Sequence, residues 1–169
     1  MHGVTIRRAK TADVVAIHGL IQPLVRQNIL LRKDLVVLYE SVQEFRVAET
    51  ADGELVACGA LHVLWLDLGE IRTIVTSDAV RGKGVGHQML EHLVDDAREL
   101  GLKRLFCLTF ETDFFRRHGF EAVAEQIVDD QVYAEMRRSP DEGVHEFLDL
   151  PWVKPNTLGN TRMVKRLDD

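Results

Sequence analysis

Apolar residues recur at three- and four-residue spacings between residues 85 and 100, which is the period of an amphipathic helix. They are Val85, Met89, Leu90, Leu93, Val94, Ala97 and Leu100. Residues 70–76 are rich in β-branched side chains and predict a strand just before this helix. Gly101 follows the last apolar position and predicts a left-handed helix cap. The pattern therefore predicts a strand, a glycine-containing loop and a helix, in that order.

The N-terminal part of the chain predicts a short strand at residues 4–8 followed by two helices. Thr11 stands where the first helix needs an N-cap, and Pro23 is expected to kink or end that helix. Asp34 is expected to cap a second, shorter helix that reaches about Ser41.

Strand-like segments at 45–49 and 55–65 are joined by Asp52-Gly53, a strong hairpin signal, and residues 70–76 add a third antiparallel strand. Beyond residue 101 strands and short helices alternate, which is typical of an α/β protein. The predicted elements are a strand at 103–108, a helix capped by Thr112 and ended by Gly119, a strand at 122–128, a helix at 132–138, turns at 139–160 and a strand at 162–167.

The composition narrows the class of protein. A chain of 169 residues is expected to form a single domain spanning 1–169. Its formal charge of -6 argues against binding to nucleic acid or to an anionic membrane, because clustered lysine and arginine hold those partners. Without a targeting segment or a long apolar run, a cytoplasmic protein is expected. Cys58 and Cys107 are predicted to be buried thiols without a disulfide or metal role.

The loop Arg81-Gly82-Lys83-Gly84-Val85-Gly86 carries the strongest chemical signal. Alternate glycines let successive backbone N–H groups converge, and the following helix adds its unpaired donors and positive dipole end. The loop is therefore predicted to bind an anion such as a pyrophosphate. Its spacing fits neither the dinucleotide fingerprint nor the nucleoside-triphosphate loop. A plain glycine turn that starts a helix is the alternative.

The spacing R-x-x-G-x-G resembles the acyl-coenzyme-A loop of the GNAT acetyltransferase superfamily. Residues 114–120, Phe-Phe-Arg-Arg-His-Gly-Phe, resemble the aromatic helix and G-F turn that follow the fifth strand of GNAT proteins. This resemblance implies an α/β GNAT fold, with a mixed, V-shaped central sheet flanked by helices, and acetyl-CoA as co-substrate without a metal. The implied coenzyme-binding residues are Ile74, Val75, Thr76, Arg81, Gly82, Lys83, Gly84, Val85, Gly86, His87 and Phe115.

Several segments are more narrowly similar to the acetyltransferase domain of the bacterial N-acetylglutamate synthase family. They are residues 6–9, 30–33, 69–71, 104–109 and 114–120. The resemblance implies acetyl transfer to the α-amine of L-glutamate, with L-glutamine as a second acceptor, in the first step of arginine biosynthesis. Longer members of that family also carry a kinase-like domain that senses arginine, and none is expected within these 169 residues.

Amine acetylation needs a base, oxyanion donors and a proton for the leaving thiolate. The resemblance implies Glu70 as the base, although its type and position also suit an ordinary edge-strand carboxylate. Backbone N–H groups near Ile74, on a strand with a local bulge, would stabilise the oxyanion. The resemblance also implies that the Thr109 hydroxyl protonates the leaving thiolate. The alternative is a structural threonine bonded to its own backbone. In that case the thiolate would take its proton from solvent or from the ammonium product.

Glutamate carries two carboxylates, for which guanidinium groups are the matching partners. The resemblance places Arg32 and Lys33 at the amino-acid site, with Arg162 and Lys165 near the C-terminus in a similar role. Strand alternation independently puts Arg72 on the same face as Glu70 if no bulge intervenes. Each cation could equally be a solvated surface charge.

Two other functions remain open from sequence. An acetyltransferase for another amine, such as a peptide N-terminus or a drug, would keep the coenzyme loop. Such an enzyme would not require Arg32, Lys33 and Arg162 in one substrate site. A non-catalytic acyl-CoA sensor would also keep it, and phenylalanines where many GNAT enzymes have a tyrosine favour that alternative. Residues 139–160, with Phe147 and Trp152, could supply the contact surface of a homodimer.

Overall fold

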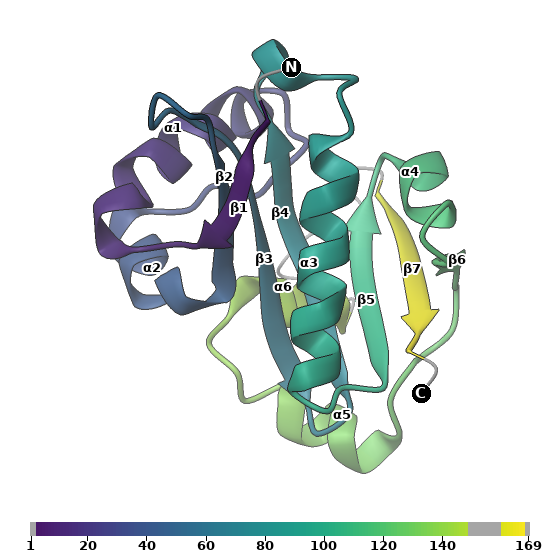
Figure 1. Cartoon of the computed structure of the whole chain (residues 1–169). Helices are drawn as coiled ribbons and strands as arrows, with labels where there is room; N and C mark the ends of the chain where they lie inside the picture. The colour runs from purple at the N-terminus through teal and green to yellow at the C-terminus, as the bar shows by residue number, and fades with distance from the viewer. Residues whose placement is uncertain (1–2, 149–159, 168–169) are drawn as a thin grey trace. The chain divides into compact units, whose positions relative to one another are not determined.

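The computed structural model describes residues 3–148 and 160–167. Within these residues seven strands form a sheet in the order β1-β2-β3-β4-β5-β7-β6, in which β4 and β5 are parallel and the pairs β1–β2, β2–β3, β5–β7 and β6–β7 are antiparallel. The predicted mixed sheet with flanking helices is therefore confirmed (Figure 1). The strands are β1 (Thr5–Arg8), β2 (Phe45–Glu49), β3 (Leu55–Trp65), β4 (Leu68–Thr76), β5 (Arg104–Thr109), β6 (Glu121–Ala122) and β7 (Thr161–Arg166).

The helices of the described residues differ widely in length. They are α1 (Val14–Arg26), α2 (Leu35–Glu40), α3 (Val85–Glu99), α4 (Thr112–Arg116), α5 (Asp130–Met136) and α6 (Glu142–Phe147), with short 3₁₀ helices at Thr11–Asp13, Val42–Glu44 and Asp78–Val80. The chain divides into two compact units. The first comprises residues 1–62 and 71–100, and the second comprises residues 63–70 and 101–169.

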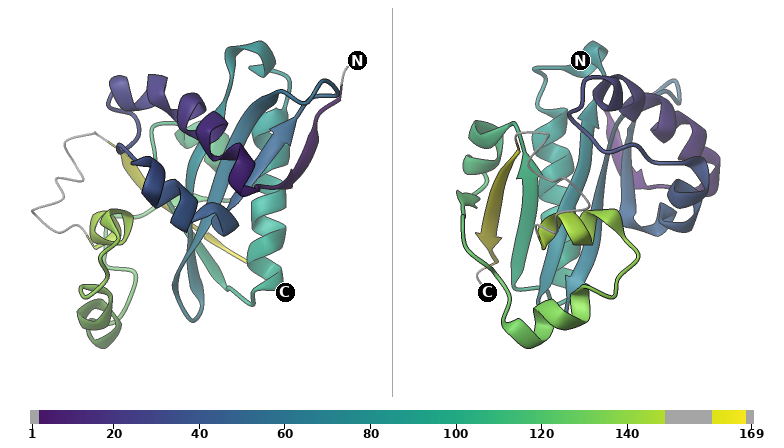
Figure 2. Two further views of the ribbon diagram at one scale, coloured as in Figure 1. Left: turned by 90° about the vertical axis from the view of Figure 1, so that its left-hand side faces the viewer. Right: turned by 180° about the vertical axis from the view of Figure 1, so that it is seen from behind.

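In the first unit, helices cover both faces of the strands (Figure 2, left). The apolar stripe of α1 packs with Leu38 of α2 against one face, where Phe45 and Val47 of β2 are buried. The alternate residue Arg46 points to the other face and pairs with Asp96 of α3. The period-two alternation of β2 thus attaches α1 and α3 to opposite sides of the same strand.

Gly59 of β3 lies directly under α3. A Cβ atom built at this glycine would lie 2.9 Å from Leu93 Cδ1, 3.0 Å from Met89 Cγ and 3.3 Å from Ile74 Cγ1. These distances leave no room for a methyl group, so the absence of a side chain lets the helix approach the sheet closely.

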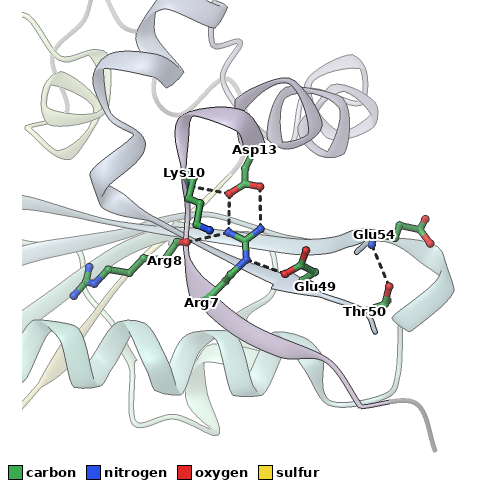
Figure 3. A network of polar contacts seen from close by, with 7 residues as sticks. All are labelled: Arg7, Arg8, Lys10, Asp13, Glu49, Thr50 and Glu54. Carbon is green, nitrogen blue, oxygen red and sulfur yellow. Dashed lines mark hydrogen bonds and ion pairs between the residues drawn. The ribbon is translucent and has the colours of Figure 1, made fainter. Parts of the chain in front are cut away.

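An ion-pair network ties β1 to the start of α1 (Figure 3). The Arg7 guanidinium donates to both Asp13 carboxylate oxygens at 2.8 and 3.0 Å, and to Glu49 of β2 at 2.9 Å. Asp13 also accepts the backbone N–H of Lys10 at 2.7 Å. The Arg7 hydrogen bonds lower the pKa of Asp13 below its ordinary value, and Asp13 and Glu49 in turn raise the pKa of Arg7.

This network explains why Thr11 does not cap the first helix as predicted. The chain enters α1 through the 3₁₀ helix Thr11–Asp13, and Asp13 takes the N-cap position of α1. Helix α1 also continues through Pro23 to Arg26, so this proline does not end the helix as one of the two predicted outcomes required. Asp34 does stand at the N-cap of α2, but its carboxylate pairs with Arg32 instead of capping the helix.

The second unit is built around β5. This strand pairs in parallel with the first residues of β4, from Leu68↔Arg104 to Glu70↔Phe106, and antiparallel with β7. One face of these strands packs against the short helices α5 and α6, coloured green in Figure 2. The core on this face contains Leu64, Leu68, Phe106, Val128, Met136, Val144, Phe147 and Leu148.

The C-terminal third departs most from the sequence predictions. The strand predicted at 122–128 is reduced to Glu121–Ala122, and helix α6 forms inside the segment predicted to be turns. Thr112 is the first residue of α4 and Glu111 is its N-cap. Phe147, predicted to lie on a dimer surface, is 2% exposed and belongs to the core, whereas Trp152 lies outside the described residues.

We expect the same substitution at two glycines to change stability in opposite directions. Gly59→Ala should destabilise the protein by about 1–3 kcal/mol, because the methyl group overpacks the contact with α3. Gly19→Ala lies in α1, where an added Cβ meets nothing within 4 Å, and should stabilise it by about 0.5–1 kcal/mol. Urea unfolding followed by circular dichroism measures both. A Gly59→Ala variant as stable as the wild type would contradict the close-approach argument.

Asp13→Asn is expected to reduce the free energy of unfolding by about 2 kcal/mol at pH 7, because the charged hydrogen bonds with Arg7 are weakened. The folded-state pKa of Asp13 is lowered from 3.8, so its contribution is complete above that value and is lost as the pH falls through the lower folded-state pKa. The variant and the wild type should therefore converge below pH 3.8. Asp95→Asn, at an exposed i,i+3 pair, is the control and should change little at any pH.

Candidate functional site

The predicted anion loop is an irregular turn that starts α3. Gly82 and Gly84 have φ angles of 77° and 81°, which are left-handed and strained for other residues. Gly84 is the N-cap of α3 and has no side chain to occupy the first-turn donors. The backbone N–H groups in the first turn of a helix point away from its hydrogen-bond ladder, so the start of α3 can offer donors to an anion.

Buried residues hold this loop at both ends. Val80 and Val85 are 8% and 5% exposed, whereas Arg81, Gly82 and Lys83 between them are exposed. A Cβ built at Gly82 or Gly84 meets nothing within 4 Å. The glycines are therefore required by the backbone conformation and not by a lack of space, and the loop surface is open to a ligand.

Strand β4 is irregular at Thr73. Its φ of 60° lies in the left-handed region, which costs a β-branched residue on the order of 1–3 kcal/mol. The predicted departure from a regular strand beside Ile74 is thus present at the preceding residue. Such strain collects where a chain must direct backbone groups toward a ligand, which suits the predicted oxyanion donor near Ile74.

In the second unit, Glu70 and Arg162 lie on the same face of the strands. Glu70 is in register with Phe106 of β5, and Arg162 of β7 is in register with Leu108. Neighbouring residues in register project to the same side, and so do residues two apart on one strand. Glu70 is 4% exposed, so this carboxylate lies in a mostly dry environment beside an aromatic ring.

Thr109 and Lys165 belong to the opposite face of these strands, because they differ from Phe106 and Arg162 by an odd number of residues. The Thr109 hydroxyl accepts the backbone N–H of Glu111 at 2.8 Å, which is the local bond considered as its structural alternative. Lys165 donates to the backbone carbonyl of His118 at 2.6 Å. The structure therefore does not bring Lys165 together with Arg162.

The candidate cations of the first unit are partly or largely at its surface. Arg32 pairs with Asp34 at 3.2 Å, and Arg81 of the glycine loop pairs with Asp78 at 3.0 Å. Exposed pairs of this kind contribute little stability, so either guanidinium can exchange its partner for a ligand. Lys33 and Arg72 are partly buried.

The aromatic signature forms a packed cluster. Phe115 of α4 is 6% exposed and meets Phe114 and Phe120 edge to face, each with ring centroids 5.1 Å apart. Its ring therefore anchors α4, and Phe114 is the more accessible of the two neighbours. The Lys165 bond to His118 fixes the turn that follows this helix.

The two cysteines are confirmed as buried thiols. Burial raises the pKa of Cys58 to about 12. Burial and, secondly, the Glu70 charge raise the pKa of Cys107 well above its ordinary value. Both thiols are therefore protonated at neutral pH, and neither is suited to carry an acyl group.

The sequence patterns did not place Phe106 or Phe147 beside the candidate residue Arg162. The Arg162 guanidinium carbon lies 5.3 Å from the centroid of the Phe106 ring and 5.9 Å from that of Phe147. Phe106 is the register partner of Glu70, and alternation along β5 could have placed its ring on one face of the strand with Leu108. No sequence signal identified Phe147, because its helix interrupts a segment rich in turn residues.

Comparison with known proteins assigns the chain to a family. Residues 24–120 match the acetyltransferase (GNAT) family. The chain is 55% identical over 161 residues to the amino-acid acetyltransferase of Mycobacterium tuberculosis, with 94% of this chain and 92% of that protein covered. An amino-acid acetyltransferase of Neisseria meningitidis is 37% identical over 124 residues, 72% of this chain but 28% of that protein.

Solved structures agree with this result. Rv2747 from Mycobacterium tuberculosis, in complex with CoA and a second ligand, superimposes with a TM-score of 0.93 at 54% identity, covering 97% of this chain and 99% of that one. The N-acetylglutamate synthase from Neisseria gonorrhoeae, complexed with coenzyme A and N-acetyl-glutamate, gives a TM-score of 0.78 at 29% identity, covering 100% of this chain and 36% of that one. The protein belongs to the GNAT family of acetyltransferases.

Residues 3–148 and 160–167 contain no group of three or more His, Cys, Asp or Glu side chains placed to hold a metal ion. No helix among them is both long and apolar enough to span a membrane.

Neither thiol is expected to react with a thiol-specific dye at pH 8 in the native protein, because both are inaccessible and protonated. After unfolding in guanidinium chloride, two thiols per chain should react. Absorbance of the released dye gives the count. Rapid labelling of one cysteine in the folded protein would show that its thiol is accessible.

Proposed function

We propose that this protein transfers an acetyl group from acetyl-CoA to the α-amine of L-glutamate, and that it acts in the cytoplasm in the first step of arginine biosynthesis. The observation that carries the proposal is the shared face of Glu70 and Arg162, a buried carboxylate and a guanidinium on either side of Phe106. This pairing offers a base for an amine and an anchor for a carboxylate, the two groups that every α-amino acid carries.

The glycine loop supports the coenzyme part of the proposal. Backbone donors at Val85, Gly86 and His87 would hold the pyrophosphate, with Arg81 and Lys83 adding positive charge at the exposed surface. Ile74, Val75 and Thr76 would pair through their main chain with the extended arm of the coenzyme, as an added strand does. The irregular backbone at Thr73 supports an oxyanion donor at Ile74.

The reaction begins with a protonated amine. Glu70 accepts one proton, directly or through water, and the free amine attacks the thioester carbonyl to give a tetrahedral oxyanion. The carbon–sulfur bond then breaks, and the second amine proton passes to the departing thiolate directly or through solvent. This route needs no acid at Thr109, whose face and bond to Glu111 favour a structural role.

Selectivity for glutamate would come from guanidinium and ammonium groups. Arg162 is our first choice for a carboxylate, because it shares the face of Glu70. Arg32, Lys33 and Arg72 are proposed as further anchors for the second carboxylate. L-glutamine keeps one carboxylate and the α-amine, so it is the acceptor against which selectivity should be measured.

The test is a screen of acetyl-CoA with each of the twenty amino acids, in which a thiol-reactive dye measures the CoA released. L-glutamate is expected to give the highest kcat/KM. Glu70→Gln should lower kcat on the order of a hundredfold or more while acetyl-CoA still binds, because general-base catalysis is lost. Glu54→Gln, at an exposed carboxylate beside the β2–β3 turn, is the matched control and should leave kcat unchanged.

Other results would overturn parts of the proposal. Thiol release with peptides or other amines, but with no amino acid, would indicate a different acceptor. Binding of acetyl-CoA without thiol release under any condition would indicate an acyl-CoA sensor. An unchanged kcat for Glu70→Gln would remove the carboxylate from the chemistry.

A further inference from the structure

The Arg162 side chain lies over two aromatic rings. Its guanidinium carbon is 5.3 Å from the Phe106 centroid and 5.9 Å from the Phe147 centroid, both within the range of a cation–π interaction. The two rings meet edge to face, with centroids 4.7 Å apart and an interplanar angle of 83°. We call Phe106 and Phe147 the aromatic platform.

The platform is fixed by its surroundings. Phe106 and Phe147 are 0% and 2% exposed and belong to one apolar core with Val144 of α6. Helix α6 begins with a side-chain cap, in which Asp141 accepts the N–H of Val144 at 2.9 Å. Closely packed rings of this kind have little freedom to rotate, so they constrain any group that rests on them.

Contact with a ring differs from contact with a carboxylate. An aromatic face attracts the cation through its quadrupole and adds no negative charge. A guanidinium that contacts an aromatic ring keeps its planar set of N–H donors, which can form two parallel hydrogen bonds to a carboxylate. The platform therefore constrains where the Arg162 guanidinium lies without adding a negative charge beside it.

We propose that Phe106 and Phe147 are positioning residues that hold Arg162 in the orientation required for the carboxylate of the amino-acid acceptor. This inference rests on the function proposed above. Because Phe106 is also the register partner of Glu70, one ring borders both the candidate base and the candidate anchor. The platform thereby sets the spacing between the amine and the carboxylate that the site accepts.

The first test replaces the aromatic ring. Phe147→Leu should raise KM for L-glutamate on the order of tenfold, with kcat and KM for acetyl-CoA changed less than twofold. Phe147→Tyr keeps the ring and should restore a KM near the wild-type value. Val144→Ala removes apolar contacts from the same helix and core, and it serves as the control for a general loss of packing. An equal rise in KM for Val144→Ala would overturn the proposal.

A second test changes the arginine. Arg162→Lys keeps the charge but loses the planar group, so its KM for L-glutamate should rise nearly as much as that of Arg162→Ala. In an Arg162→Ala background, Phe147→Leu should have no further effect, because the platform acts through this side chain. Additive effects of the two substitutions would contradict a positioning role. The Arg162→Lys result stands even where a ring variant fails to fold.

The outcomes separate this inference from the proposed function. Calorimetric titration with L-glutamate in the presence of CoA measures acceptor binding without turnover. Failure of the wild type to bind L-glutamate would overturn both proposals. If Arg162→Ala weakens binding but Phe147→Leu does not, the guanidinium anchor stands and the aromatic platform is wrong. If neither substitution changes binding, Arg162 is not the anchor.

Discussion

Side chains along β5 and β7 alternate between two faces, and this alternation sorts the candidate residues of the second unit. Glu70, Phe106 and Arg162 fall on the face covered by α5 and α6. Thr109 and Lys165 fall on the other, where they hold the turns on either side of α4. A shift of one residue in either register would move Glu70 or Arg162 to the other face of the sheet and so separate the buried carboxylate from the guanidinium.

The sequence predicted the secondary structure best at positions where the conformation of a single residue or turn fixes the backbone. Gly101 ends α3, Asp52-Gly53 joins β2 to β3, and the glycines at 82 and 84 adopt the positive φ that their loop requires. The sequence predicted helix starts and short helices less well where contacts with residues distant in the chain determine them. Thr11 suits an N-cap, but Arg7 attracts Asp13 into a network that changes how α1 begins. Helix α6 formed among turn residues because Val144 and Phe147 pack against β5.

The candidate site follows the same division. Glu70 and the loop at 81–86 could be found from spacing and family resemblance, because each lies in a short, recognisable segment. Arg162 and Lys165 were both implied as substrate residues, and the interval of three residues between them puts their side chains on opposite faces of β7. The contact between Arg162 and the aromatic platform could not be predicted from the sequence. It brings together β7, β5 and α6, which are distant along the chain.

The burial of both cysteines has a consequence for an enzyme that works with a thioester. Each acetyl transfer from CoA ends with a free thiol leaving the protein, and under oxidising conditions such a thiol forms a mixed disulfide with an accessible protein thiolate. Cys58 and Cys107 are the chain's complete set, and they are 0% and 1% exposed. The protein therefore offers its own product no sulfur partner, and spent coenzyme cannot become covalently trapped on the catalyst.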